Sequence, residues 1–355
     1  MRIIEVNGTP ETVLERSDLP IERLRDILAG ETLAVLGYGT QGRAQALNLR
    51  DQGFRVVVGL RETGASYPCA LTDGWQPGVN LLSIPEASLQ GSILFYLLSD
   101  AGQREQWSVI LPYLTAGKAL VFAHGFSIAY ADQTRVIPPP DVDVLLVAPK
   151  GSGTTLRRQF LEGRWMNAGF AIHQDATGKG KERCVALCFA IGSGYLFETT
   201  IARETTCDLV GERGTLLGAI YGLWLAQYEV LREHGHSAVE AFNESVEEAT
   251  QSLYPLIAEK GMDWMYANCS TTAQRGALDW YQRFRDALKP IFTELYQSVT
   301  SGQEARMALA ANSQPDYHQQ LQAELAAMAQ SEMWQAGRLL RQLRPPERKH
   351  DTGVG

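Results

Sequence analysis

The sequence Thr32-Leu33-Ala34-Val35-Leu36-Gly37-Tyr38-Gly39-Thr40-Gln41-Gly42 joins a short apolar run to a glycine-rich turn. The apolar run is typical of a buried parallel strand, and a helical pattern from Arg43 to Asp51 follows the turn. A second apolar run, Arg55–Leu60, completes a strand–turn–helix–strand unit of about 30 residues. In this setting the Gly-x-Gly-x-x-Gly spacing predicts a dinucleotide site, because the glycines admit a pyrophosphate and the helix N-terminus offers free N–H groups. The residues that we expect to contact the dinucleotide here are Gly37, Tyr38, Gly39, Thr40, Gln41 and Gly42.

The end of the second predicted strand bears on the choice of cofactor. Sites for NAD usually place an acid there to hold the ribose diol. This chain instead has Arg61 and Ser66, which offer a charge and a hydroxyl to a 2′-phosphate. Glu62 would oppose this if its side chain turned inward. We therefore expect NADPH rather than NADH.

Three more apolar runs each end at polar residues. Ser92–Leu98 ends at Ser99 and Asp100, Ala119–Ala123 at His124, and Val144–Ala148 at Lys150. Ligands of an open parallel sheet bind outside the carboxyl ends of its strands, so these four side chains are candidate cofactor or catalytic residues. The alternatives are a hydrogen-bonded turn histidine and an ordinary surface lysine. A further strand (Gly169–His173) and a helix (Lys179–Ile191) follow.

The second half of the chain is nearly all helical in pattern. We expect helices over Leu209–Glu233, Ala238–Glu259, Trp280–Thr300 and Gln319–Leu343. The same half of the chain contains two pairs of carboxylates at four-residue spacing, which places each pair on one face if the segment is helical. The pairs are Asp208 with Glu212 and Glu244 with Glu248. Oxygen-only ligands favour Mg²⁺ or Mn²⁺, so the pattern predicts a metal site; the alternative is two solvated acidic faces.

Length and composition bound the class of protein. A chain of 355 residues suggests two domains, and 45% hydrophobic with 20% charged residues is ordinary for a globular enzyme. We expect an α/β Rossmann-like, doubly wound domain over residues 1–197, an all-α domain over 198–344 and a disordered tail over 345–355. The net charge of −8 argues against a nucleic-acid partner. The five cysteines form no CxxC motif, and no apolar run has membrane-spanning length, so we expect a cytoplasmic protein.

Together these motifs resemble those of the ketol-acid reductoisomerases of the short type, with a single helical domain. The resemblance covers roughly residues 15 to 345. The motifs that carry it are Gly37–Gly42 with Ala46–Arg50, Phe122–Phe126, Ala148–Gly151, Arg157–Gln159, Glu198–Thr200, Asp208–Glu212, and Glu244 with Glu248.

The resemblance implies a role for each matched residue. Asp208 would bridge two Mg²⁺ ions, Glu212 would hold one, and Glu244 and Glu248 would reach the site from the partner subunit of a homodimer or a higher homo-oligomer. Glu248 could also relay a proton. Ser270 would bond the substrate carboxylate, and the helical domain would be knotted.

The resemblance also places His124 and Lys150 between nicotinamide and metals. The family reaction moves an alkyl group within a 2-hydroxy-2-alkyl-3-keto acid such as 2-acetolactate. Hydride from NADPH then reduces the 2-keto acid formed to a 2,3-dihydroxy acid, on the path to valine and isoleucine.

Several positions depart from the usual family pattern, mostly on the substrate side. They are Ser99, Ser152, Thr154, Arg213, Gln274, Arg275 and Ala277. Arg275 adds a cation where an aromatic residue is usual, which would suit a larger or more acidic substrate. Three interpretations therefore remain: the family enzyme, a relative with another substrate in a specialised pathway, and a non-catalytic cofactor-binding protein. The complete carboxylate set argues against the last.

Overall fold

The computed structural model describes residues 2–344, which form two compact units. Unit 1 contains residues 2–208 and 302–312, and unit 2 contains residues 209–301 and 313–344. The domain boundary expected after residue 197 stays a prediction, and the tail predicted as disordered, 345–355, lies outside the described residues. Within residues 2–344, no helix has both the length and the apolar character needed to cross a membrane.

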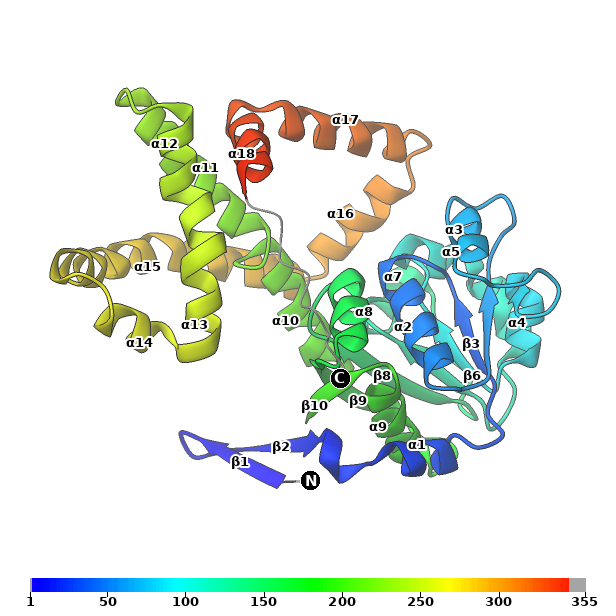
Figure 1. The fold of residues 1–355 in the computed structure, drawn as a ribbon. Helices are drawn as coiled ribbons and strands as arrows, with labels where there is room; N and C mark the ends of the chain where they lie inside the picture. The colour runs from blue at the N-terminus through cyan, green and yellow to red at the C-terminus, as the bar shows by residue number, and fades with distance from the viewer. Residues whose placement is uncertain (1, 345–355) are drawn as a thin grey trace, which may run out of the picture. The chain divides into compact units, whose positions relative to one another are not determined.

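A ten-stranded mixed sheet forms the centre of unit 1, in the order β1-β2-β10-β9-β8-β7-β6-β3-β4-β5 (Figure 1). The block from β8 to β5 is entirely parallel, and its strand order is that of the doubly wound dinucleotide-binding fold. The predicted fold class is thus confirmed. The strands are β1 (Arg2–Val6), β2 (Thr9–Glu15), β3 (Leu33–Leu36), β4 (Val56–Gly59), β5 (Leu81–Leu82), β6 (Ile93–Tyr96), β7 (Ala119–Phe122), β8 (Asp143–Pro149), β9 (Met166–Gln174) and β10 (Ser193–Glu198).

Successive side chains of the central strands are buried on opposite faces of the sheet. Val35 and Phe95 belong to one apolar cluster, whereas their neighbours Ala34 and Leu94 belong to the other. This alternation explains why the strands read as continuous apolar runs, since both faces are covered by helices. One face carries α1 (Ile21–Ile27), α2 (Thr40–Asp51), α3 (Tyr67–Thr72) and α9 (Gly180–Ala190). The other carries α4 (Ile84–Gln90), α5 (Asp100–Ile110), α6 (Phe126–Ala129) and the start of α10 (Ile201–Arg213).

Four strands, β1, β2, β5 and β10, were not predicted. β1 is exposed along its whole length and β5 has only two residues, so neither has the buried apolar pattern that identifies a strand. β2 and β1 form an antiparallel hairpin that extends the sheet beyond β10. The remaining short elements of unit 1 are the 3₁₀ turns Arg16–Asp18 and Leu111–Tyr113 and the helices α7 (Ala131–Thr134), α8 (Gly153–Leu161) and α16 (Gln303–Asn312).

Unit 2 is all helical, as expected, but two predicted helices are broken. The helix expected over Leu209–Glu233 is interrupted after Arg213, and the one expected over Gln319–Leu343 is interrupted at Ser331. Ser331 is the reason for the second break, since its side chain accepts the backbone N–H of Trp334 and begins a new helix. The helices are α11 (Gly218–Glu233), α12 (Ala238–Phe242), α13 (Tyr254–Lys260), α14 (Met262–Ala267), α15 (Thr271–Thr300), α17 (Tyr317–Gln330) and α18 (Glu332–Leu343).

The helix expected over Ala238–Glu259 is also wrong in its middle. Residues Asn243–Glu247 and Ala249–Leu253 form π-helical turns between α12 and α13. The hydroxyls of Ser245 and Thr250 donate to the carbonyls of Ala241 and Val246, one turn back. Such side-chain bonds compete with the backbone ladder. Sequence periodicity cannot separate this widened turn from an α-helix.

Candidate active site

The turn after β3 has the geometry that a dinucleotide requires. Gly37 has φ +101°, and a Cβ there would lie 2.7 Å from the Leu97 carbonyl oxygen. A Cβ on Gly42 would lie 2.2 Å from the Gly37 carbonyl oxygen, so only glycine lets α2 start this close to the strand. Open space adjoins Gly39, the N-cap of α2, at the position where the backbone would approach a pyrophosphate. The local structure therefore fits the predicted cofactor.

Four of the predicted side chains or turns lie along one edge of the sheet. Gly37, Asp100, His124 and Lys150 follow β3, β6, β7 and β8, which are consecutive neighbours in the parallel block. Their shared position at the carboxyl ends of these strands brings them to the same edge. Ser99 also follows β6, directly before Asp100; it is the N-cap of α5, and its hydroxyl oxygen accepts the backbone N–H of Gly102.

Helix α10 brings two carboxylates to the residues that follow β7 and β8. His124 Nδ1 lies 3.0 Å from Asp208 Oδ2 and 4.0 Å from Glu204 Oε2. Lys150 Nζ lies 2.5 Å from Glu204 Oε1 and 4.0 Å from Asp208 Oδ1. The helix can approach this closely because Gly125 has no side chain: a Cβ there would lie 2.6 Å from the Thr205 hydroxyl. We call His124, Lys150, Glu204 and Asp208 the polar cluster.

The charges in the polar cluster stabilise one another. Burial lowers the pKa of His124, but the hydrogen bond with Asp208 and the charges of Asp100 and Asp208 outweigh it and raise the pKa overall. For Asp208, burial raises the pKa. The contact with His124 and the positive charges of His124 and Lys150 outweigh burial and lower the pKa below its usual range. Burial also raises the pKa of Asp100.

Glu204 was missed by the sequence reasoning. Its side chain is only 2% exposed, and its Oε2 atom is buried without a hydrogen-bond partner among residues 2–344. A signal was available, because Glu204, Asp208 and Glu212 are three acids at four-residue spacing. One ligand atom each from His124, Glu204 and Asp208 lie within 4.8 Å of one another, a grouping that can hold a metal ion.

The other predicted metal ligands belong to unit 2. Glu212 lies one turn after Asp208 on α10, and its carboxylate is 3.8 Å from Arg213. Glu244 and Glu248 are exposed, and neither carboxylate has a hydrogen-bond or ion-pair partner among residues 2–344. Glu244 lies in the first π-helical turn and Glu248 directly follows it. π-Helical turns are rare in proteins, and those that occur are often found at functional sites. Their presence distinguishes this pair of carboxylates from an ordinary acidic helix face.

Ser270 is the N-cap of α15, a helix of 30 residues. Its hydroxyl oxygen accepts the backbone N–H of Ala273, which leaves the hydroxyl proton free to be donated. Gln274 and Arg275, two of the positions that depart from the family pattern, make local contacts. Gln274 donates to the Tyr266 carbonyl at 2.7 Å, and Arg275 pairs with Asp279 one helical turn later.

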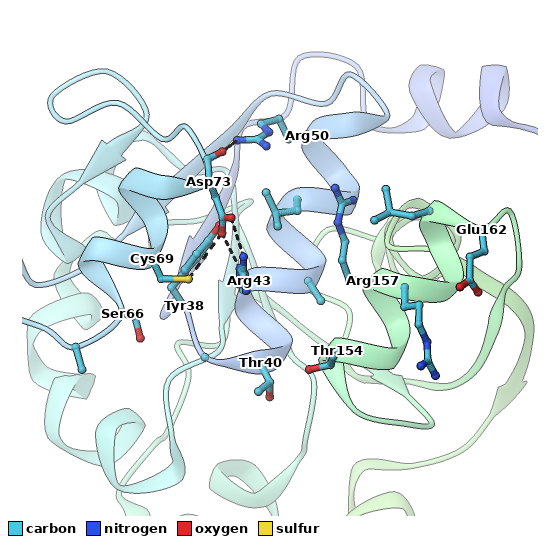
Figure 2. A pocket seen from close by; sticks show the side chains of 17 residues that line it. Tyr38, Thr40, Arg43, Arg50, Ser66, Cys69, Asp73, Thr154, Arg157 and Glu162 are labelled. Atoms are coloured by element: carbon cyan, nitrogen blue, oxygen red, sulfur yellow. Dashed lines mark hydrogen bonds and ion pairs between the residues drawn. The ribbon is translucent and has the colours of Figure 1, made fainter. Parts of the chain in front are cut away.

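A cavity of about 780 Å³ adjoins the start of α2 (Figure 2). Gly39, Thr40 and Ser66 line one part of it, and the outer faces of α2, α3 and α8 line the rest. Four arginines and two carboxylates contribute to the wall: Arg43, Arg50, Arg157, Arg158, Asp73 and Glu162. Arg61 is exposed and is not among the lining residues, so its predicted contact with the cofactor stays a prediction.

The fold and the polar cluster define a class of protein, the oxidoreductases that bind a nicotinamide dinucleotide at the carboxyl edge of a doubly wound sheet. Two family models divide the chain between them. The acetohydroxy acid isomeroreductase NADPH-binding domain matches residues 27–195, and the ketol-acid reductoisomerase C-terminal domain matches residues 201–346.

Individual relatives agree with the family models. The mitochondrial ketol-acid reductoisomerase of Neurospora crassa is 55% identical over 98% of this chain and 87% of its own length. The ketol-acid reductoisomerase (NAD(+)) of Desulfosudis oleivorans is 53% identical over 98% of this chain and 99% of its own. The solved structure of an NADH-preferring ketol-acid reductoisomerase from an uncultured archean has a TM-score of 0.84 and 32% identity, covering 94% of this chain and 99% of that one. The chain belongs to the ketol-acid reductoisomerase family.

Proposed function

We propose that the chain converts 2-acetolactate-type 2-hydroxy-2-alkyl-3-keto acids to 2,3-dihydroxy acids, using Mg²⁺ and NADPH, in valine and isoleucine biosynthesis. The observation that carries the proposal is the polar cluster at the carboxyl ends of β7 and β8. It lies on the sheet edge that also holds the glycine turn after β3. A substrate at this edge would meet proton donors and carboxylates beside the cofactor.

The donor chemistry fits divalent cations. Asp208 is half-buried, and the adjacent Oε2 of Glu204 is buried without a partner among the described residues. Asp208 and Glu212, with Glu244 and Glu248 of a partner subunit, would supply the oxygen-only set that Mg²⁺ prefers. When bound, the cations supply Lewis acidity, which lowers the pKa of the C2 hydroxyl and polarises the C3 carbonyl.

The chain's own side chains would manage the protons. During migration the C2 hydroxyl loses its proton, the alkyl group moves with its electron pair from C2 to C3, and the C3 oxygen gains a proton. Lys150 Nζ, held by Glu204, is a donor for an oxygen at this position, and Glu248 is a candidate relay. The buried Nδ1 atom of His124 lies 3.0 Å from Asp208 Oδ2, and this contact orients the ring at the site. When bound at the turn after β3, the nicotinamide would supply a hydride for the C2 keto group, and the C2 oxygen would take its proton from one of these donors.

Substrate binding would use the start of α15. The Ser270 hydroxyl can donate to a carboxylate, and the N-terminus of so long a helix carries a partial positive charge. Arg275 is already neutralised by Asp279 and Gln274 is bonded to the backbone, so both are engaged in holding the start of α15. This supports the usual family substrate over a more acidic one.

For the cofactor we propose NADPH, read by Ser66 in the cavity wall and by Arg61 in the same loop. The family model named for NADPH binding supports this choice, whereas two of the relatives are named for NAD(+) or NADH. We further propose a homodimer or higher homo-oligomer, because Glu244 and Glu248 have no partner among residues 2–344. A cytoplasmic location and the knot stay predictions; the Neurospora relative is named as mitochondrial.

The test is turnover of 2-acetolactate with NADPH and saturating Mg²⁺, followed by identification of the product. We expect the 2,3-dihydroxy acid, and loss of activity on chelation. The same assay with the 2-keto-3-hydroxy acid isolates the reduction step. Reduction of the second substrate without conversion of the first would instead establish a reductase with another natural substrate.

A further inference from the structure

One end of the cavity beside α2 lies where the adenosine ribose of a dinucleotide is expected. In this fold the pyrophosphate meets the N-terminus of the first helix, and the loop after the second strand reads the ribose. Gly39 and Thr40 represent the first of these positions, and Ser66 the second; all three line the cavity. A phosphate on the ribose 2′-oxygen would therefore lie inside this cavity, whose wall contains four arginines.

Two of those arginines are occupied in holding the protein together. Arg157 donates to Asn48 Oδ1 at 2.8 Å and pairs with Asp51 at 2.6 Å. Arg50 donates to the Asp73 carbonyl at 2.7 Å and stacks over the Trp75 ring. Both guanidinium groups therefore already have protein partners, which makes them less suited to bind an anionic ligand.

Arg43 is held differently, by one edge of its guanidinium. Its Nε and Nη2 atoms donate to Asp73 Oδ2 and Oδ1 at 2.7 and 2.8 Å (Figure 2). Nη1 has no hydrogen-bond partner among residues 2–344, and the side chain is 49% exposed in the cavity wall. The planar fork thus retains donors for a second anion in a fixed orientation.

Asp73 is itself fixed from several sides. Its Oδ2 atom also accepts the hydroxyl of Tyr38 at 2.8 Å, and that hydroxyl accepts the Trp75 indole N–H at 2.6 Å. Its carboxylate is only 12% exposed, so Arg43 rather than Asp73 faces a ligand. Tyr38 belongs to the glycine turn, and this network therefore ties Arg43 to the loop that binds the cofactor.

We propose that Arg43, oriented by the Asp73 carboxylate, reads the 2′-phosphate of the cofactor together with Ser66. Cofactor choice then depends on the first helix as well as on the loop that contains Arg61. The inference rests on the proposed use of NADPH. It assigns Arg43 as a specificity residue and Asp73 as a positioning residue.

The test measures binding rather than turnover, with NADPH, NADH, 2′,5′-ADP and 5′-AMP as probes. Arg43→Ala is expected to weaken NADPH and 2′,5′-ADP roughly 10-fold or more while leaving NADH and 5′-AMP within about 2-fold. Arg43→Lys should fall between, because it retains the charge but loses the fork. Asp73→Asn should weaken NADPH only when Arg43 is present.

Two control variants sharpen the result. Arg158→Ala removes the same charge from the same cavity wall, and equal losses in both variants would attribute binding to the general positive potential and overturn the role of Arg43. An Arg43→Ala protein with an unchanged ratio of NADPH to NADH affinity would overturn it as well. Because no substrate is present, either outcome leaves the proposed reaction untouched, and absence of acetolactate turnover would leave the Arg43 result standing.

Discussion

At the scale of single residues, buried ionic contacts determine what the site can do. Lys150 and Glu204 form a pair in which the carboxylate is almost fully buried, and Asp208, a proposed metal ligand, pairs with His124. Removing one partner of a buried pair leaves the other uncompensated, which costs about 3–5 kcal/mol. Conservative amide substitutions are therefore the informative ones, since they remove charge and keep shape.

We expect Asp208→Asn to reduce Mg²⁺-dependent turnover by at least about 100-fold, because a neutral amide oxygen would be a poor replacement for a charged carboxylate as a ligand of Mg²⁺. NADPH affinity should stay within about 2-fold of wild type. Steady-state kinetics over a range of Mg²⁺ concentrations and a fluorescence titration of NADPH measure the two quantities. Full turnover in this variant would contradict the metal role of Asp208.

The Asp73 network predicts a pH dependence of stability. The hydrogen bonds from Arg43 hold the pKa of Asp73 below its usual range. A depressed carboxylate pKa contributes stability that is present above the unfolded-state pKa of about 3.9 and is lost as the pH falls through the folded-state pKa. We expect Asp73→Asn to lower the free energy of unfolding by about 2 kcal/mol at pH 7, with the two proteins converging toward pH 3. Urea denaturation at several pH values checks this, and a constant gap down to pH 3 would exclude the ionised carboxylate as the cause.

At the scale of elements, the packing of α18 against α12 forms the apolar core of unit 2. Phe242 and Val246 meet Met333 and Ala336 in one buried cluster. Gly337 faces the Phe242 ring so closely that a Cβ there would lie 2.3 Å from it. α12 leads directly into the π-helical turn Asn243–Glu247, which contains Glu244.

Gly337→Ala should therefore destabilise the protein by about 1–3 kcal/mol through overpacking. Gly222→Ala is the matched control, because Gly222 lies in α11 with open space at its Cβ position, where alanine favours the helix. Urea midpoints with unchanged slopes give the comparison. Equal stability of the two variants would mean that α18 can move away from Phe242 without cost.

At the scale of the whole molecule, the proposed metal set is divided between the units. Asp208 ends unit 1, whereas Glu212, Glu244 and Glu248 belong to unit 2. The exposure of Glu244 and Glu248 suits ligands that serve another subunit. An isologous dimer would then contain two equivalent shared sites.

Mixing equal amounts of Asp208→Asn chains and Glu244→Gln chains should restore activity to about a quarter of wild type. About half of the dimers would then be mixed, and each mixed dimer would keep one of its two sites intact. The measurement is turnover after co-refolding, with the mixed dimers counted by mass spectrometry. Glu247→Gln is the control, because Glu247 pairs with Arg344 and is not a predicted ligand. Mixed dimers without any activity would place each site within one chain.

The sequence by itself determined the features that depend on neighbours along the chain. The glycine turn, the burial of β3 and β6, and the spacing of Asp208 and Glu212 are local patterns that are readable in the sequence. Even the position of Lys150 at a strand end followed from its apolar run. Tertiary structure decided the rest, because the pairing of Glu204 with Lys150 and of Arg43 with Asp73 joins residues 54 and 30 positions apart. Such contacts depend on strand order and helix packing, and no local period records them.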